Sequence, residues 1–295
     1  MDQETKNKIL LAGKISAEAL QYGANLIKPG VKLLDVAQKV EAKIKELGGL
    51  PAFPVNISLN SIAAHYTPIP SDESIFQDEV VKLDVGAHVD GFTGDNAVTI
   101  DLSNKYSDLI KASKGALSAA IKVVRPGATL GEIGRAIEET IQGFGFEPIR
   151  NLSGHEMGNF TLHTGQNIPN YNTGDDTELR EGQLIAIEPF ATTGVGMIHE
   201  KGEAFIHSQT FKKPVRSQIT RDVLKIMQPF NGLPFATRWL TNKLPMFKIN
   251  FAFRELNQLG ILKSYAPLIE KREGLVSQAE HTVLVEDKSI TTTNI

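Results

Sequence analysis

Two acidic residues stand inside a stretch that otherwise predicts a pair of β-strands. Residues 80–85 and 97–100 are mostly apolar or β-branched, and Asp90-Gly91 between them is typical of a tight hairpin turn. With an even number of loop residues, facing positions have numbers whose sum is odd, so Asp84 and Asp95 project from one face, opposite or one diagonal step apart. A proton on one of them, a basic side chain between them or a bound cation would relieve their repulsion.

Further residues of metal-ligand type follow downstream. Four carboxylates and one imidazole suit a pair of divalent ions such as Co, Mn, Fe, Zn or Ni. Carboxylates that bridge two ions hold them about 3.5–4 Å apart in hydrolytic sites. The sequence therefore favours the bound cation among the three remedies. The expected ligands are Asp84, Asp95, His155, Glu188 and Glu280.

Taken singly, each of these residues also fits a structural role. His155 alone could be a loop histidine, and Glu188 or Glu280 a charged residue at the end or edge of a strand. His65 and His163 could be satisfied polar residues. We expect no functional role for the other histidines, which are His88, His199, His207 and His281. The sequence contains no P-loop and no Gly-x-Ser-x-Gly motif, and Gly194-Val195-Gly196 is typical of a turn.

The elements that must hold these residues occur twice. Helical spacing of apolar residues predicts helices at 3–28, 34–47, 106–124 and 130–142. A shift of 97 residues superimposes the two copies, beginning with a Pro-Gly pair at 29–30 and again at 126–127. His65 and His163 match within one residue. We therefore expect two helix–helix–strand units about a pseudo-twofold axis, with ligands from both halves meeting on that axis.

One block interrupts the second unit. Residues 208–265 predict helices at 219–227, 235–240 and 247–259, separated by glycine and proline. Strand character returns at 277–285, which includes Glu280. We expect one domain over residues 1–295, of α+β class, into which residues 208–265 are inserted as a helical subdomain.

Composition narrows the class of protein further. The chain has 295 residues, a net charge of −3 and no cysteine, which excludes disulfides, thiolate metal sites and a cysteine nucleophile. The charge gives no reason to expect DNA or a membrane as a partner. The first residues do not resemble a signal peptide, and no segment has the roughly 20 apolar residues of a membrane helix. We expect a cytoplasmic monomer.

Six motifs resemble the methionine aminopeptidases, in particular the type 2 enzymes of archaea and eukaryotes. They are PAFPVN at 51–56, AAHYTP at 63–68, KLDVG at 82–86, NLSGH at 151–155, AIEPF at 186–190 and QAEHT at 278–282. The resemblance implies the pita-bread (creatinase/aminopeptidase) fold, which has pseudo-twofold symmetric halves. The helical insertion is similar to that of type 2, and the lack of a long basic N-terminal extension resembles the compact archaeal form.

The resemblance also implies roles for the expected ligands. Asp95 and Glu280 would bridge two metal ions, Asp84 would complete one ion, and His155 with Glu188 would complete the other. A metal-bridging hydroxide would attack the first peptide bond, and Glu188 would also carry a proton as a catalytic residue.

The same family pattern implies a substrate site. His163 would stabilise the tetrahedral intermediate and His65 would position the substrate. The methionine side chain would enter a pocket that includes Phe53, Leu162, Phe190 and Tyr265. The implied activity is removal of the initiator methionine from nascent proteins with a small second residue, with a transient ribosome contact as a further expectation.

Two alternatives stay open at this point. Within the same fold, a prolidase or Xaa-Pro aminopeptidase is one, although such enzymes usually carry an additional N-terminal domain. The other is a non-catalytic pita-bread protein that binds RNA and ribosomes. Such relatives have lost metal ligands, whereas this chain has all five.

Overall fold

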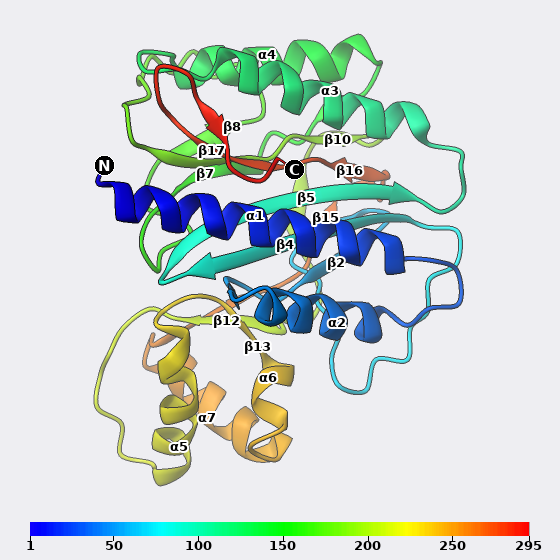
Figure 1. The fold of residues 1–295 in the computed structure, drawn as a ribbon. Helices are drawn as coiled ribbons and strands as arrows, with labels where there is room; N and C mark the ends of the chain where they lie inside the picture. Colours follow the sequence, from blue (N-terminus) through cyan, green and yellow to red (C-terminus); the bar gives the residue numbers. More distant parts are fainter. Residues whose placement is uncertain (295) are drawn as a thin grey trace.

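Two helices and an antiparallel sheet form the first half of the chain. The computed structural model describes residues 1–294. It places α1 (Gln3–Leu26) and α2 (Leu33–Glu46) beside long β4 (Val80–Val89), which pairs with β1 (Leu50–Pro51), β2 (Asn56–Leu59) and β5 (Phe92–Asp101) (Figure 1). A short strand, β3 (Ile62–Ala64), follows β2. The Asp2 side chain starts α1 by accepting a hydrogen bond from the Thr5 amide.

The second half repeats these elements. Its helices are α3 (Ser107–Val123) and α4 (Leu130–Gly143), and its first strands are β6 (Glu147–Pro148), β7 (Ser153–Met157), β8 (Asn167–Pro169), β9 (Leu184–Ile187), β10 (Phe190–Thr192) and β11 (Ile198–Glu200). The limits of α4 and β6 lie 97 residues after those of α2 and β1. Gly30 and Gly127 both have a positive φ, of 85° and 81°, so the same turn precedes both helices. The predicted repeat is confirmed.

The hairpin of β4 and β5 has the predicted turn and register. Asp90 and Gly91 both have a positive φ, as a two-residue hairpin turn requires. Asp84 faces Ala97 and Asp95 faces Gly86, so the two acids are one diagonal step apart on one face. The parity argument from the sequence is therefore confirmed.

Helix α1 lies directly on this hairpin. A Cβ atom at Gly94 of β5 would be 2.5 Å from the Gly13 Cα atom of α1, which is closer than side chains approach. Because both positions are glycine, the backbone of α1 packs directly against the backbone of β5. This contact sets the distance between the helix and the hairpin.

The halves meet between β5 and the last strands, β16 (Val276–Gln278) and β17 (His281–Leu284). The expected strand at 277–285 is interrupted at Glu280, where the chain changes partner from β10 to β9 and pairs with Ala97 of β5. On one side of this bridge the Thr282 hydroxyl accepts from the Asp95 amide at 2.7 Å. On the other side the Thr99 hydroxyl accepts from the Gln278 amide at 2.8 Å. The hydroxyls satisfy backbone groups that the diverging strands leave unpaired.

The block predicted as an insertion forms a sheet and an apolar core of its own. β12 (Ile206–Gln209) pairs with β13 (Phe235–Ala236) and β14 (Leu262–Tyr265). Helices α5 (Gln218–Met227), α6 (Thr237–Thr241) and α7 (Met246–Gln258), with the short 3-10 helix η1 (Gln228–Phe230), pack around buried apolar residues of the block itself. The helix expected at 235–240 begins two residues late because Phe235 and Ala236 pair with β12. In Figure 1 the block lies below the two halves.

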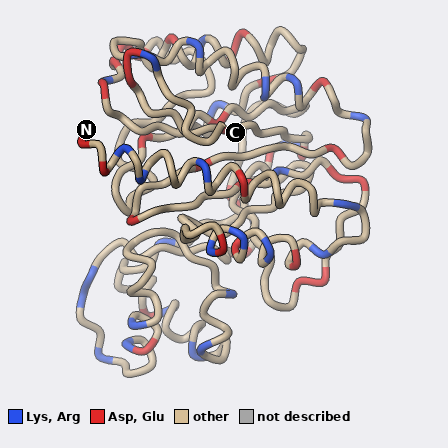
Figure 2. Tube along the Cα trace, viewed as in Figure 1, with Lys and Arg blue, Asp and Glu red and all other residues tan. Residues whose placement is uncertain are grey.

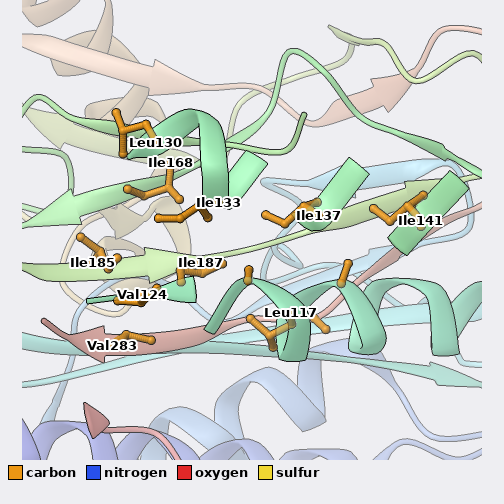
Figure 3. Packing of buried hydrophobic residues seen from close by; sticks show 14 of the residues in the cluster. Leu117, Val124, Leu130, Ile133, Ile137, Ile141, Ile168, Ile185, Ile187 and Val283 are labelled. Carbon is orange, nitrogen blue, oxygen red and sulfur yellow. The ribbon is translucent and has the colours of Figure 1, made fainter. Parts of the chain in front are cut away.

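Apolar side chains fill the space between the helices and sheet of the second half. Ile133, Ile137 and Ile141 follow one face of α4 and pack toward Ile185 and Ile187 of β9 (Figure 3).

The remaining strands are β15 (Leu268–Glu270), which joins β3 and β11 in one sheet, and β18 (Ile290–Thr291). Within residues 1–294, no helix combines the length and apolarity needed to cross a bilayer.

A buried ion pair attaches the inserted block to the first half. Arg238 of α6 bonds to Glu41 of α2, and both residues are less than 10% exposed. The Trp239 indole donates to the other Glu41 oxygen at 2.9 Å, and the Val55 amide donates to Glu41 at 3.3 Å. Arg238 also bonds to Thr67 and Pro68. The pair therefore joins α2, the inserted block and the segments on either side of His65.

Removing one member of this pair should strongly destabilise the protein. Arg238→Met leaves the Glu41 carboxylate buried without its cation, and we expect the free energy of unfolding to fall by about 3–5 kcal/mol. Adding Glu41→Gln should restore most of the loss. Urea denaturation measures both, with Arg254→Met on the exposed side of α7 as the control. A loss under about 1 kcal/mol in Arg238→Met would show that the pair does not hold the block in place.

Candidate metal centre and substrate cavity

The five expected ligands come from strands of both halves and line one cavity of about 240 Å³. Asp84 lies on β4, Asp95 on β5 and His155 on β7, while Glu188 follows β9 and Glu280 stands between β16 and β17. Asp95, His155 and Glu280 each offer one ligand atom within 4.8 Å of the others. The His155 Nε2 atom is 3.7 Å from Asp95 Oδ2 and 3.8 Å from Glu188 Oε1. The structure thus brings together all five residues that the sequence singled out.

The two halves contribute through matching positions. The register of β4 with β1, β2 and β5 recurs in the pairing of β9 and β10 with β6, β7, β16 and β17. Glu188 then takes the place of Asp84, and Gln278 takes the place of Asp95. Glu280 corresponds to Ala97, and these two residues pair with each other across the seam, the line where the two halves meet. The second half therefore carries an amide where the first half carries its second acid.

The carboxyl groups are withdrawn from water and close to one another. Asp95 and Glu280 are 3% and 2% exposed, and the Glu188 side chain is 15% exposed. Burial, followed by the charges of neighbouring acids, raises the pKa of Asp95, Glu188 and Glu280 well above the usual range. Burial also raises the pKa of Asp84 to about 7, although a hydrogen bond from Gln278 opposes the shift. Without a cation, the group cannot hold four negative charges at neutral pH.

Among residues 1–294, His155 is the only basic side chain within 4 Å of these carboxylates. Burial, with a smaller effect of His163, lowers the pKa of His155 to about 3, so the ring is neutral. A basic side chain therefore does not relieve the repulsion. Two ways of relieving the repulsion between the acids remain: protonation of the acids and binding of a cation.

Buried oxygen atoms of the site that have no hydrogen-bond donor are suited to binding a cation. One oxygen of Asp84 and one of Asp95 are buried without any hydrogen-bond donor, which is costly for a carboxylate. A neutral imidazole with buried carboxylates is a donor set that divalent transition ions accept. The Gln278 amide lies 3.5 Å from Asp84 and 3.3 Å from Glu280, where it orients both side chains without adding charge.

His65 and His163 lie at the opening of the same cavity. The ring centroid of His163 is 4.2 Å from that of His155, and the ring of Tyr265 meets His65 edge-on at 5.6 Å. Burial lowers the pKa of His65 to about 4 and also lowers that of His163. Both rings are therefore neutral at pH 7 and can donate or accept a hydrogen bond. His65 has a positive φ of 64°, an unusual conformation for a non-glycine residue.

Three of the four residues expected around the methionine side chain line the cavity. They are Phe53, Leu162 and Tyr265. Gly86 gives Phe53 its place, because a Cβ atom there would lie 2.1 Å from the Phe53 ring. Phe190 is not among the lining residues: it is fully buried in an apolar cluster with Ala63 and Val276. Its contribution to the cavity is through packing.

Three further residues that line the cavity were not among those expected from the sequence. Asn56, Ile206 and Pro234 also face the cavity, the last two from the inserted block or its first strand. Asn56 lies in the PAFPVN motif, so its position could have been noted. Ile206 and Pro234 reach the cavity only through the pairing of β12 with β13 and β14, which no local pattern specifies.

Comparison with known proteins agrees with this arrangement. The model of metallopeptidase family M24 matches residues 7–287. The chain is 49% identical over 295 residues to a methionine aminopeptidase of Archaeoglobus fulgidus, and the match covers 99% of both chains. The structure of methionine aminopeptidase from Thermotoga maritima is similar, with a TM-score of 0.74 and 25% identity over 100% of this chain and 98% of that one.

A second solved structure shares the fold at lower identity. A thermophilic Arx1 superimposes with a TM-score of 0.86 at 18% identity, over 99% of this chain and 91% of that one. The pita-bread fold expected from the sequence is confirmed by these neighbours. The chain is a member of metallopeptidase family M24 and groups within it with the methionine aminopeptidases.

Proposed function

We propose that the chain removes the N-terminal methionine from nascent proteins whose second residue is small, and that it uses two divalent metal ions. The observation that carries the proposal is the buried convergence of four carboxylates and a neutral imidazole on one small cavity. The family membership supports the same reaction. The cavity volume of about 240 Å³ is below the roughly 300–1,000 Å³ of sites for drug-sized ligands and suits a single side chain.

Of the five proposed ligands, two would bind both ions and three would bind one ion each. Asp95 and Glu280, which lie one diagonal step apart where the two halves meet, are the proposed bridging ligands. Asp84 serves one ion, and His155 with Glu188 serves the other. Bound ions would polarise the scissile carbonyl and lower the pKa of water in the site. Divalent Co, Mn, Fe, Zn and Ni all accept this donor set.

The remaining side chains would handle the substrate and its protons. His163 is placed to donate a hydrogen bond to the carbonyl oxygen that gains negative charge during cleavage, because its ring is neutral and faces the cavity. His65, held beside Tyr265, positions the first residue of the substrate. Glu188 would pass a proton to the leaving amine, since its side chain is 15% exposed whereas that of Asp95 is 5% exposed.

Residues 208–265 are proposed to act as a subdomain of the single catalytic domain that spans 1–295. They supply Tyr265 and Pro234 to the cavity. They also contain ten basic and two acidic residues, a net charge of +8, whereas the whole chain carries −3 (Figure 2). This charge supports a transient contact with the ribosome, where nascent chains emerge, and such a contact would require a cytoplasmic location. We propose a monomer that binds neither DNA nor membranes.

Peptide cleavage tests the proposed activity. Metal-loaded enzyme should release methionine from Met-Ala-Ser peptides and leave Xaa-Pro peptides intact. His155→Ala should lower kcat/KM by at least the roughly 10–100-fold that loss of a supporting residue costs in metal sites. His199→Ala, an exposed histidine outside the cavity, is the matched control.

Two results would overturn this assignment. Cleavage restricted to Xaa-Pro peptides would indicate a prolidase-type enzyme. Neither cleavage nor binding of any divalent ion, measured by elemental analysis after addition of each metal, would indicate a non-catalytic pita-bread protein.

Metal binding should release protons. Burial raises the pKa of Asp84 to about 7, and burial with the charges of neighbouring acids raises the pKa of Asp95, Glu188 and Glu280 well above the usual range, so the metal-free site holds protons near pH 6. A divalent cation favours the ionised forms and expels these protons. Titration calorimetry with Mn²⁺ at pH 6 in two buffers of different ionisation enthalpy gives the number released. Equal heats in both buffers would contradict the prediction.

The bridging and terminal ligands should respond differently to excess metal. Asp95→Asn removes a donor from both proposed ions, so activity should stay absent at any Mn²⁺ concentration. Asp84→Asn weakens one ion only, and a large excess of Mn²⁺ should partly restore activity. Metal titrations of both variants check this, and equal rescue of the two would show that Asp95 does not bridge.

A further inference from the structure

A larger groove continues outward from the metal cavity. Its volume is about 940 Å³, and it shares His65, His163, Tyr265 and Pro234 among others with the inner cavity. The two spaces are therefore one continuous opening. If the inner cavity takes the first residue, as the proposed function requires, the following residues of the substrate have to lie in this groove.

Two lysines of the inserted block stand on the wall of the groove. Lys263 lies on β14, two residues before Tyr265 and so on the same face of the strand, and Lys212 follows β12. The Lys263 Nζ atom lies 4.8 Å from the centroid of the Tyr265 ring. Within residues 1–294 neither lysine has an acidic partner within 4 Å. Both ammonium groups are therefore available to a ligand.

One acid, Glu200 of β11, also lines the groove. Its position affects the electrostatic potential that a substrate in the groove would meet. The charge of Lys263 reaches the inner end of the groove, because it lowers the pKa of both His65 and His163. Glu200 is not among the groups that shift either histidine. Among the charged residues that line the groove, Lys263 is therefore the one whose charge acts on the end nearest the scissile bond.

We infer that Lys263 forms a subsite for an acidic side chain at the third or fourth residue of the substrate. The inner cavity holds the first residue beside His65 and Tyr265, and the small second residue lies at the junction of the cavity and the groove. An extended chain advances about 3.4 Å per residue, so the next one or two residues reach Lys263, which is about 7 Å along β14 from Tyr265. The ammonium group is exposed, so the preference should be modest, roughly 2–5-fold.

Matched peptides test this subsite. In Met-Ala peptides with Asp or Asn at position three, four or five, the wild-type enzyme should show a 2–5-fold higher kcat/KM for Asp at position three or four, mainly through a lower KM. The ratio should fall toward one at high salt. Lys263→Met should abolish the Asp/Asn ratio, Lys263→Glu should invert it, and Lys263→Arg should preserve it. Lys243→Glu, the same charge change on the block but outside the groove, should leave the ratio unchanged.

The Asn peptides separate this inference from the proposed function on which it rests. Cleavage of Asn peptides with an Asp/Asn ratio of one at every position would overturn the subsite and leave the aminopeptidase activity standing. A ratio that survives in Lys263→Met would do the same. Failure to cleave even the Asn peptides would remove both the proposed function and the subsite.

Discussion

The mutual repulsion of four buried carboxylates is the constraint that the rest of the structure serves. Asp84, Asp95, Glu188 and Glu280 lose hydration on folding and gain like-charged neighbours, so each is more stable as the neutral acid unless a cation is present. A scaffold that could relax would move them apart. Here three of them sit in or next to strands of two paired sheets, and the fourth is fixed by backbone bonds across the seam, so relaxation would break the sheet itself. Rigid strands thus maintain a cluster whose ionised form is favourable only with a cation.

The seam between the halves shows how this rigidity is achieved. One bridge, between Ala97 and Glu280, lies where the two related sheets approach, and strands on either side diverge. Thr99 and Thr282 occupy matching positions and each contacts the backbone of the other half. Each hydroxyl both accepts and donates, and so replaces a pair of ladder bonds. The two acids closest to the seam, Asp95 and Glu280, are held by the backbone bonds that join the halves.

Much of this could be predicted from the sequence because the information is local or repeated. The hairpin parity depends only on the turn, and the offset of 97 residues carried the boundaries of α2 and β1 onto α4 and β6. What the sequence did not reveal depends on long-range pairing. Pro234 and Ile206 reach the cavity through a small sheet whose strands are separated by long helical segments. The total charge of −3 also concealed the +8 of residues 208–265, because opposite excesses cancel in the sum.

The internal repeat explains the metal centre but not the substrate site, and the difference lies in the insertion. Symmetry-related strands supply an acid from each half, and the exception, Gln278 in place of a second acid, contacts Asp84 and Glu280 without adding a charge. The substrate side is less symmetric: His65 and His163 match in the repeat, but the other walls of the cavity do not. Its walls come from the PAFPVN segment of one half and from β12, β14 and Pro234 of the block that only the other half contains. The Glu41–Arg238 pair holds these two walls together from behind, through contacts on Val55, Thr67 and Pro68. The repeated half-domains therefore supply the expected metal ligands, whereas the docked insertion completes the wall of the cavity beside them.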